Sequence, residues 1–410
     1  MKFKKRPNVP SYRHHAASGQ GYVEFNGRRH YLGRYDLPET REAYHRLIAE
    51  WLSNGRQLAV ALDEITIVEI LARFMVHAEE YYRRPDGTAT SSINGYRIAI
   101  KPLQELYGRT PAAQFGPVAL RAVRQKMIDR GVSRGVVNQS INLIRTIFKW
   151  ATAQELIPVS VHTSLQTLES LRRGRTPARE TDRVRPAPDH LVDAIRPFVS
   201  RQVWALVGLQ RLTGARAGEL VIMRPIDLDT SGAVWLYRPP LHKTSHHGHD
   251  RTIYLGPKAQ EVVQPFLTGR SVDAYVFSAA DAEQERREEM HRRRETPLSC
   301  GNRPGTNRSD NPKRPPGAHY ETSGYRRAIA RACERAFPVP EGMEAKEARK
   351  WRKEHSWHPH QLRHNAATYL RRQFGIEAAR IILGHKSAAI TEVYAEMDTA
   401  RAVEVMGKIG

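Results

Sequence analysis

The stretch HPHQLRHNAATYL, residues 358–370, is the part of the chain from which fold and function are best inferred. Pro359 suits the first turn of a helix, where its missing N–H is no loss. His360 and Arg363 are three residues apart and therefore share one face of that helix. An imidazole and a guanidinium that point the same way are suited to a phosphoryl oxyanion, although an ordinary polar helix face has the same spacing.

A second arginine precedes this helix in the segment TGARAGEL, residues 213–220. Gly214 predicts a turn that places Arg216 at the start of a helix, with Glu219 one turn later. A guanidinium at a helix N-terminus can bind phosphate oxygens with two parallel hydrogen bonds. Taken alone, the segment is explained better by a surface ion pair, in which Glu219 supports Arg216.

Two further groups are candidates for phosphate chemistry. Lys243 lies at the tip of an expected hairpin, from which a lysine can enter a groove and donate a proton, although most such lysines are merely solvated. Tyr394 follows His385 of the segment LGH, residues 383–385, by nine residues. A phenol with a pKa near 10 is a poor nucleophile unless cations surround it. An ordinary half-buried tyrosine is the alternative.

The composition favours a polyanionic partner. The 410 residues include 65 Lys and Arg against 43 Asp and Glu, a net charge of +22. Two cysteines exclude a disulfide-stapled secreted scaffold, and no apolar run is long enough to predict a membrane span. We expect a cytoplasmic, nucleoid-associated protein without cofactor. A metal site in the His-rich hairpin is disfavoured because no Cys or carboxylate spacing accompanies His246, His247 and His249.

Hydrophobic periodicity predicts three domains. For residues 1–57, the sequence pattern predicts a basic arm, a β-hairpin that turns at Asn26-Gly27, and a helix. A short third strand near Arg34 is also possible. Residues 63–170 predict helices alone, and the last of them, 134–155, has a strong apolar stripe. Residues 171–188 form an exposed basic linker. Residues 189–410 predict helices and two strands, with a flexible insertion at 281–318 and a C-terminal tail at 395–410.

The order Arg, Lys, His-x-x-Arg, Leu-Gly-His and Tyr, over about 180 residues, resembles the catalytic domain of tyrosine recombinases, the phage integrase family. HPHQLRHNAATYL and LGHKSAAITEVYA are close to that family's usual sequence. The segment INLIRTIFKWATAQELIP looks like the end of the family's core-binding domain. The N-terminal hairpin and helix look like an arm-binding domain. The insertion 281–318 is longer than the family needs.

The resemblance implies a mainly α fold with small antiparallel β elements. A small N-terminal sheet-plus-helix domain would precede a helical core-binding domain and an α+β catalytic domain. It also implies roles: Tyr394 would attack a scissile phosphate and form a 3′-phosphotyrosine. Arg216 and Arg363 would bind the nonbridging oxygens, and Lys243 would protonate the leaving 5′-oxygen. His360 would assist proton transfer, and His385 would hydrogen-bond the phosphate.

The implied partner is double-stranded DNA, bound by a homotetramer that exchanges strands through a Holliday junction, with an accessory DNA-bending protein left open. We expect a recombinase that integrates or excises a mobile element. An Xer-like chromosome-dimer recombinase and a type IB topoisomerase remain alternatives. The complete set of six candidate catalytic residues argues against a DNA-binding protein that has lost catalysis. The candidate DNA-binding residues are basic side chains of the arm, the hairpin and the helix 134–155: Lys2, Lys4, Lys5, Arg6, Arg28, Arg29, Arg34 and Lys149.

Overall fold

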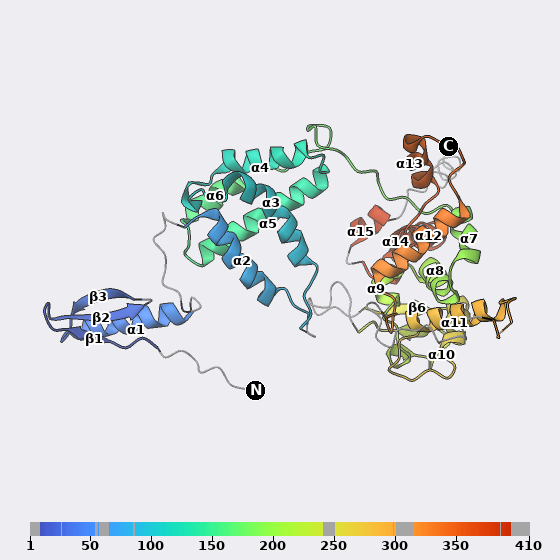
Figure 1. Ribbon diagram of the computed structural model, residues 1–410, viewed down its shortest axis with the longest axis horizontal. Helices are drawn as coiled ribbons and strands as arrows, with labels where there is room; N and C mark the ends of the chain where they lie inside the picture. The colour runs from blue at the N-terminus through green and yellow to red at the C-terminus, as the bar shows by residue number, and fades with distance from the viewer. Residues whose placement is uncertain are drawn as a thin grey trace, which may run out of the picture. The chain divides into compact units, whose positions relative to one another are not determined.

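The fold is mostly helical, with two small antiparallel sheets (Figure 1). In this computed structural model, the structure describes residues 9–25, 27–53, 56, 65–84, 87–240, 251–297, 299–300, 315–385 and 387–394. The chain divides into two compact units, Met1–Asp182 and Arg183–Gly410. Within the described ranges, no helix is long and apolar enough to cross a membrane. The predominance of helices and the small antiparallel sheets confirm the predicted fold class.

The first unit opens with a three-stranded sheet and one helix. Strands β1 (Arg13–His15), β2 (Gln20–Phe25) and β3 (Arg28–Arg34) pair antiparallel in that order, and α1 spans Pro38–Ser53. Val23 and Phe25 of β2 pack on Ile48 of α1 and form a small core. The expected hairpin is confirmed, but a third strand near Arg34 was a wrong prediction. The additional strand is instead β1, which precedes the hairpin in the chain. Arg34 belongs to β3, whose pairing with β2 continues past a bulge at Gly21/Tyr22.

The rest of the first unit is a helical bundle. Its apolar side chains form one core, to which α5 contributes the stripe predicted from its sequence. The short helix α6 was not predicted, because only Val161 and Leu165 are buried on it. The elements are α2 (Ile67–Tyr81), α3 (Ser92–Tyr107), η1 (Ala112–Gln114), α4 (Pro117–Asp129), α5 (Arg134–Ala153) and α6 (Val159–Gln166).

The expected linker, residues 171–188, contains no helix or strand, and the boundary between the two units falls inside it. Its first part is attached to the helical bundle, since Arg134 Nε lies 2.6 Å from a carboxylate oxygen of Glu180. Its last part belongs to the second unit, where the backbone N–H of Ala187 donates to Asn365 at 2.8 Å. The segment is therefore held to a folded unit at each end.

In the second unit, helices and a small sheet surround one large core, and a smaller apolar cluster lies along α14. Helix α8 is buried along most of its length and lies at the centre of that core. Strands β4, β5 and β6 form the antiparallel sheet, of which the two-residue β4 was not predicted. The elements up to residue 267 are α7 (Asp189–Ala194), η2 (Arg196–Phe198), α8 (Arg201–Thr213), α9 (Ala217–Leu220), η3 (Pro225–Asp227), β4 (Leu228–Asp229), β5 (Trp235–Tyr237), β6 (Ile253–Leu255) and α10 (Pro257–Leu267).

Beyond residue 267, the described residues form five more helices: α11 (Ala279–Arg292), α12 (Thr322–Ala336), α13 (Ala345–Glu354), α14 (Pro359–Leu383) and α15 (Ala388–Tyr394). Gly375 interrupts α14 with φ 83° and ψ 172°, so the helix is divided into two halves at this residue. The expected flexible insertion 281–318 is helical at its start. Ala282 of α11 is buried, and Glu285 forms an ion pair with Arg201 at 2.8 Å. Residues 301–314 lie outside the described ranges.

Candidate active site

The turn that follows α8 brings two distant parts of the second unit together. Gly214 has φ 64°, a left-handed conformation that glycine adopts at little cost. A Cβ at this position would collide with the side chain of Leu383 and lie 3.1 Å from Cβ of Ala366. The turn therefore packs directly on α14, and it presents Arg216 beside that helix, as the sequence predicts.

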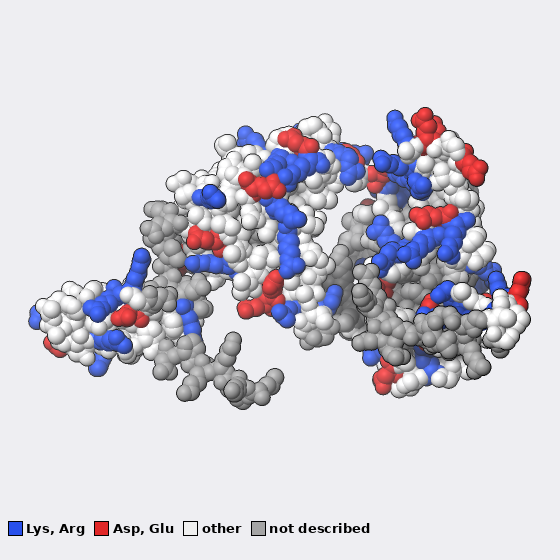
Figure 2. All heavy atoms as spheres, in the orientation of Figure 1, with Lys and Arg blue, Asp and Glu red and all other residues white. Residues whose placement is uncertain are grey.

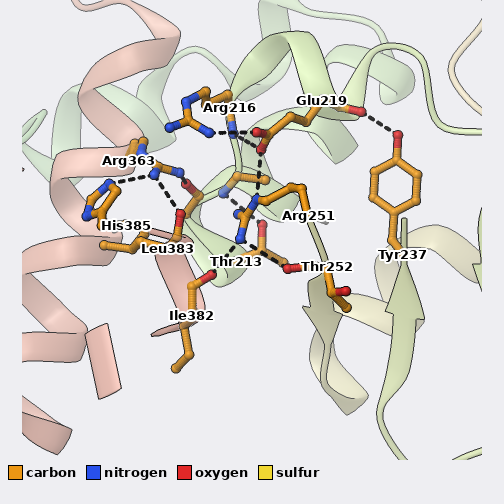
Figure 3. Close-up of polar contacts among 12 residues, drawn as sticks. Thr213, Arg216, Glu219, Tyr237, Arg251, Thr252, Arg363, Ile382, Leu383 and His385 are labelled. Carbon is orange, nitrogen blue, oxygen red and sulfur yellow. Dashed lines mark hydrogen bonds and ion pairs between the residues drawn. The ribbon is translucent and has the colours of Figure 1, made fainter. Parts of the chain in front are cut away.

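Arg363 of α14 is fully buried and joins these segments (Figure 3). Its Nη1 donates to the carbonyl of Gly214 at 2.6 Å, and its Nη2 donates to the carbonyl of Leu383 at 2.8 Å. Nη2 also lies 2.7 Å from Nε2 of His385. Among the described residues, its Nε has no hydrogen-bond partner. One N–H of a buried guanidinium thus remains available for an acceptor.

The bonds of His385 define its tautomer. A guanidinium can only donate, so Nε2 of His385 accepts from Arg363 and Nδ1 carries the proton. Nδ1 lies 3.0 Å from Oγ1 of Thr391, a fully buried residue of α15, and donates a hydrogen bond to that oxygen. In this arrangement the Nε2 lone pair of His385 accepts from Arg363, and donation to a phosphate requires the proton to move from Nδ1 to Nε2.

Glu219 is buried and holds Arg216 through two bonds. The backbone N–H of Arg216 donates to one carboxylate oxygen at 2.9 Å, and its Nη1 donates to the other at 2.8 Å. Nε of Arg251 lies 3.6 Å from the same carboxylate, and Tyr237 donates to the backbone carbonyl of Glu219 at 2.5 Å. Because Glu219 is only 2 % exposed, the surface ion pair considered from the sequence is in fact a buried one.

The ring of Tyr394 is half-buried among three imidazoles and a guanidinium. Its centroid lies 5.4 Å from that of His360, 4.8 Å from that of His364 and 5.1 Å from that of His385. The guanidinium carbon of Arg363 lies 5.3 Å from the same ring. Arg363 thus places a cation beside this ring, and a nearby cation makes a phenol a better nucleophile. Five of the six residues predicted as catalytic are therefore neighbours: Arg216, His360, Arg363, His385 and Tyr394.

Burial and positive charge shift the pKa values of these groups. Burial, followed by His364 and Arg363, lowers the pKa of His360 to about 4. Burial and the three arginines lower the pKa of His385 to about 3. Burial also lowers the pKa of Arg363, and it would raise that of Glu219, but Arg251 and Arg216 outweigh it and lower the pKa of that carboxyl. Both imidazoles are consequently neutral near pH 7.

Three neighbours of the site were not predicted from the sequence: Arg251, His364 and Thr391. His364 could have been found, because it lies one turn after His360 on the same face of α14. Thr391 carries no comparable signal, since only the packing of α15 places it beside His385. Arg251 is an isolated arginine beside a short strand, and its burial follows from tertiary contacts alone.

Several predicted site residues lie outside the described ranges. These are Lys243, the His-rich segment around it, the arm residues Lys2, Lys4, Lys5 and Arg6, and the tail 395–410. The remaining DNA-binding candidates are described. Arg28, Arg29 and Arg34 are exposed on β3, and Lys149 is exposed on α5.

Comparison with known proteins identifies the family. The sequence model of the phage integrase family matches residues 190–401, more than half of the chain, whereas no curated protein matches it. A crystal structure of a lambda integrase dimer bound to a COC′ core site is similar at 15 % identity, over 97 % of each chain, with a TM-score of 0.52.

Two other solved structures show the same fold. One is a lambda integrase tetramer bound to a Holliday junction, at 16 % identity over 96 % of this chain and 97 % of that one, with a TM-score of 0.52. The other is a Tn1549 transposon integrase in complex with transposon right end DNA, at 16 % identity over 84 % and 99 %, with a TM-score of 0.54. Because the family match covers the whole part of the chain that builds the Tyr394 site, the chain belongs to the phage integrase family and is a tyrosine site-specific recombinase.

Proposed function

We propose that the protein cleaves and rejoins duplex DNA through a 3′-phosphotyrosine on Tyr394. The observation that carries this proposal is the position of Tyr394 beside Arg363 and three imidazoles, with Arg216 close by. Tyr394 Oη attacks the scissile phosphorus as the bond to the 5′-oxygen breaks. The phosphodiester energy is kept in the new P–O bond, so the 5′-hydroxyl of another strand can reverse the step.

The geometry suggests how the proton and the charge are handled. His360 is neutral at pH 7 and 5.4 Å from the ring of Tyr394, so it can accept the phenolic proton. Arg216 and the unpartnered Nε of Arg363 can bind the nonbridging oxygens and stabilise charge as it develops. His385 can donate a hydrogen bond to the same oxygens once its proton has moved from Nδ1 to Nε2. Lys243 lies outside the described residues, and only the resemblance to the family supports it as the proposed general acid for the leaving 5′-oxygen.

DNA binding is supported by the basic faces of the chain. Figure 2 shows Lys and Arg side chains gathered over the helices of the second unit. Helix α12 exposes Arg326, Arg327, Arg331 and Arg335, while its other face is buried in the core. Such exposed arginines contact phosphates without reading sequence. Lys149 of α5 would make a similar contact from the helical bundle.

The N-terminal sheet is suited to a second, separate DNA contact. The residues of β2 and β3 alternate, so Val23 and Phe25 face α1 while Tyr22 and Glu24 lie on the opposite face with Tyr31 and Arg29. On that face Arg29 and Tyr31 are exposed, whereas Tyr22 is buried. The guanidinium of Arg29 lies 5.1 Å from the ring of Tyr22. A ribbon of this width fits a major groove. This unit favours an integrase of a mobile element over the Xer-like and topoisomerase alternatives.

The active assembly we propose is a homotetramer that resolves a Holliday junction, with an accessory DNA-bending protein as a further partner. The similar fold of a lambda integrase tetramer bound to a Holliday junction supports this assembly. Exchange of two strand pairs requires four nucleophiles, and each chain supplies one Tyr394.

A nicked suicide substrate tests the chemistry directly. The wild-type protein is expected to form a covalent DNA adduct that is stable to denaturation, and Tyr394→Phe is expected to form none while binding DNA normally. Tyr369→Phe is the matched control, because Tyr369 is 59 % exposed on α14. Adduct formation by Tyr394→Phe at the wild-type rate would show that another residue is the nucleophile.

A further inference from the structure

Arg251 is a buried arginine for which the reaction described above has no role. It lies two residues before the start of β6, and its side chain is only 5 % exposed. Moving a guanidinium out of water is unfavourable unless several partners compensate for the loss of hydration. A buried arginine at the edge of an active site therefore calls for an explanation in terms of its contacts.

The contacts of Arg251 join three separate segments (Figure 3). Its Nη1 donates to the carbonyl of Thr252 at 3.0 Å and to that of Ile382 at 3.1 Å, which fixes the guanidinium against the end of α14. Its Nε lies 3.6 Å from a carboxylate oxygen of Glu219. Gly384 makes this approach feasible, because a Cβ at that position would lie 2.5 Å from Nη1 of Arg251.

Glu219 links Arg251 to Arg216. The carboxylate lies between the two guanidinium groups, at 3.6 Å from Nε of Arg251 and 2.8 Å from Nη1 of Arg216. Helix α9 spans only Ala217–Leu220, so it constrains the Glu219 side chain weakly by itself. Arg251 is hydrogen-bonded to the carbonyl of Ile382 in α14, and its positive charge attracts the carboxylate of Glu219 to a defined position. The side chain of Arg216, which is 27 % exposed, is then held by that carboxylate.

We propose that Arg251 is a positioning residue for DNA cleavage, which holds Glu219 in place so that Arg216 is presented to the scissile phosphate. This inference rests on the proposed cleavage at Tyr394. An arginine side chain has many rotamers, and fixing it before the phosphate arrives removes an entropic cost from the transition state. Arg251 itself does not contact the DNA in this proposal.

The test is a double-mutant cycle on single-turnover adduct formation at saturating suicide substrate. Arg251→Lys keeps the charge but loses the planar guanidinium, in which Nη1 donates to the two carbonyls while Nε faces Glu219. We expect adduct formation to slow about 10²-fold, as for other misplaced catalytic groups, with unchanged DNA affinity. In a Glu219→Gln background, Arg251→Lys should cause no further loss, because its effect passes through Glu219. A residue that only stabilised the fold would slow both backgrounds equally.

Arg211→Lys is the matched control, since Arg211 forms ion pairs with Asp189 and Asp193 on the surface of the same unit. Cleavage by Arg251→Lys at the rate of this control would overturn the proposal. Losses that multiply in the double variant would also overturn it, because Arg251 would then act independently of Glu219. Failure of the wild-type protein to form any adduct would instead refute the cleavage at Tyr394 on which the inference rests.

If Arg251→Lys does not fold, Gly384→Ala provides a second route. The added Cβ displaces the Arg251 guanidinium without removing it. Gly269→Ala controls for backbone strain, because Gly269 has φ +71° and no atom within 4 Å of an added Cβ. Gly384→Ala should cleave more slowly than Gly269→Ala, and this difference should vanish in the Glu219→Gln background. A difference that persists there would contradict the proposal.

Discussion

His364 donates a hydrogen bond from Nδ1 to the backbone carbonyl of Tyr394, at 3.1 Å. A carbonyl can only accept, so Nδ1 carries the proton. The bond ties the last residue of α15 to α14, and the two rings lie 4.8 Å apart. His364 therefore limits how far Tyr394 can move from Arg363 and His360.

Removing the donor at residue 364 should slow cleavage without weakening DNA binding. His364→Phe keeps a ring beside Tyr394 but cannot donate, whereas His364→Asn places an amide N–H near the position of Nδ1. We expect His364→Asn to form the covalent adduct faster than His364→Phe, by about tenfold if one hydrogen bond is worth about 1.4 kcal/mol. Equal rates for the two variants would show that the bond does not position the nucleophile.

Arg216 and Arg363 should respond differently to replacement by lysine. Both variants lose the guanidinium fork, so we expect cleavage to fall about 10²-fold in each, as on removal of an oxyanion donor. Arg363→Lys should also lower the thermal midpoint, because it leaves the carbonyl of Gly214 or Leu383 without its buried donor. Arg216→Lys keeps a positive charge beside the buried carboxylate of Glu219, so it should lower the thermal midpoint less than Arg363→Lys does. Normal cleavage by both variants would mean that other arginines bind the phosphate.

A residue of this site can be predicted from the sequence when it belongs to a recognisable motif or periodic pattern, and not when only tertiary contacts place it. Helical spacing alone places His360 and Arg363 on one face, whereas Tyr394 is joined to them only by the resemblance of the motif order to the tyrosine recombinase family. The apolar stripe of α5 is predictable as well, because it repeats over many turns. Arg251 has no such pattern, since its partners at Ile382 and Glu219 are remote in the chain. The strand β1 was missed because three exposed or half-buried residues show no alternation.

The lowered pKa of His360 should make the stability of the DNA-free protein depend on pH. Its pKa is about 4 in the fold, against 6.5 for an ordinary histidine, so the unfolded chain binds more protons between these values. Stability should therefore decrease as the pH falls from about 6.5 towards 4. His360→Gln should reduce the slope of thermal midpoint against pH, whereas His190→Gln, at an exposed position of α7, should not. An unchanged slope in His360→Gln would indicate that this imidazole is already protonated in the fold.

The N-terminal sheet should bind a DNA site distinct from the one that is cleaved. Val23, Phe25 and Ile48 give it a core of its own, so its removal should leave the helical bundle and the Tyr394 site folded. Deleting residues 1–57 should preserve adduct formation on a core site but abolish a second, distal footprint on attachment DNA. Replacing Arg28, Arg29 and Arg34 together by alanine should weaken the same footprint, since these exposed side chains lie on β3. A single protected region that neither change alters would show that this sheet is not an arm-type DNA reader, and it would favour the Xer-like alternative.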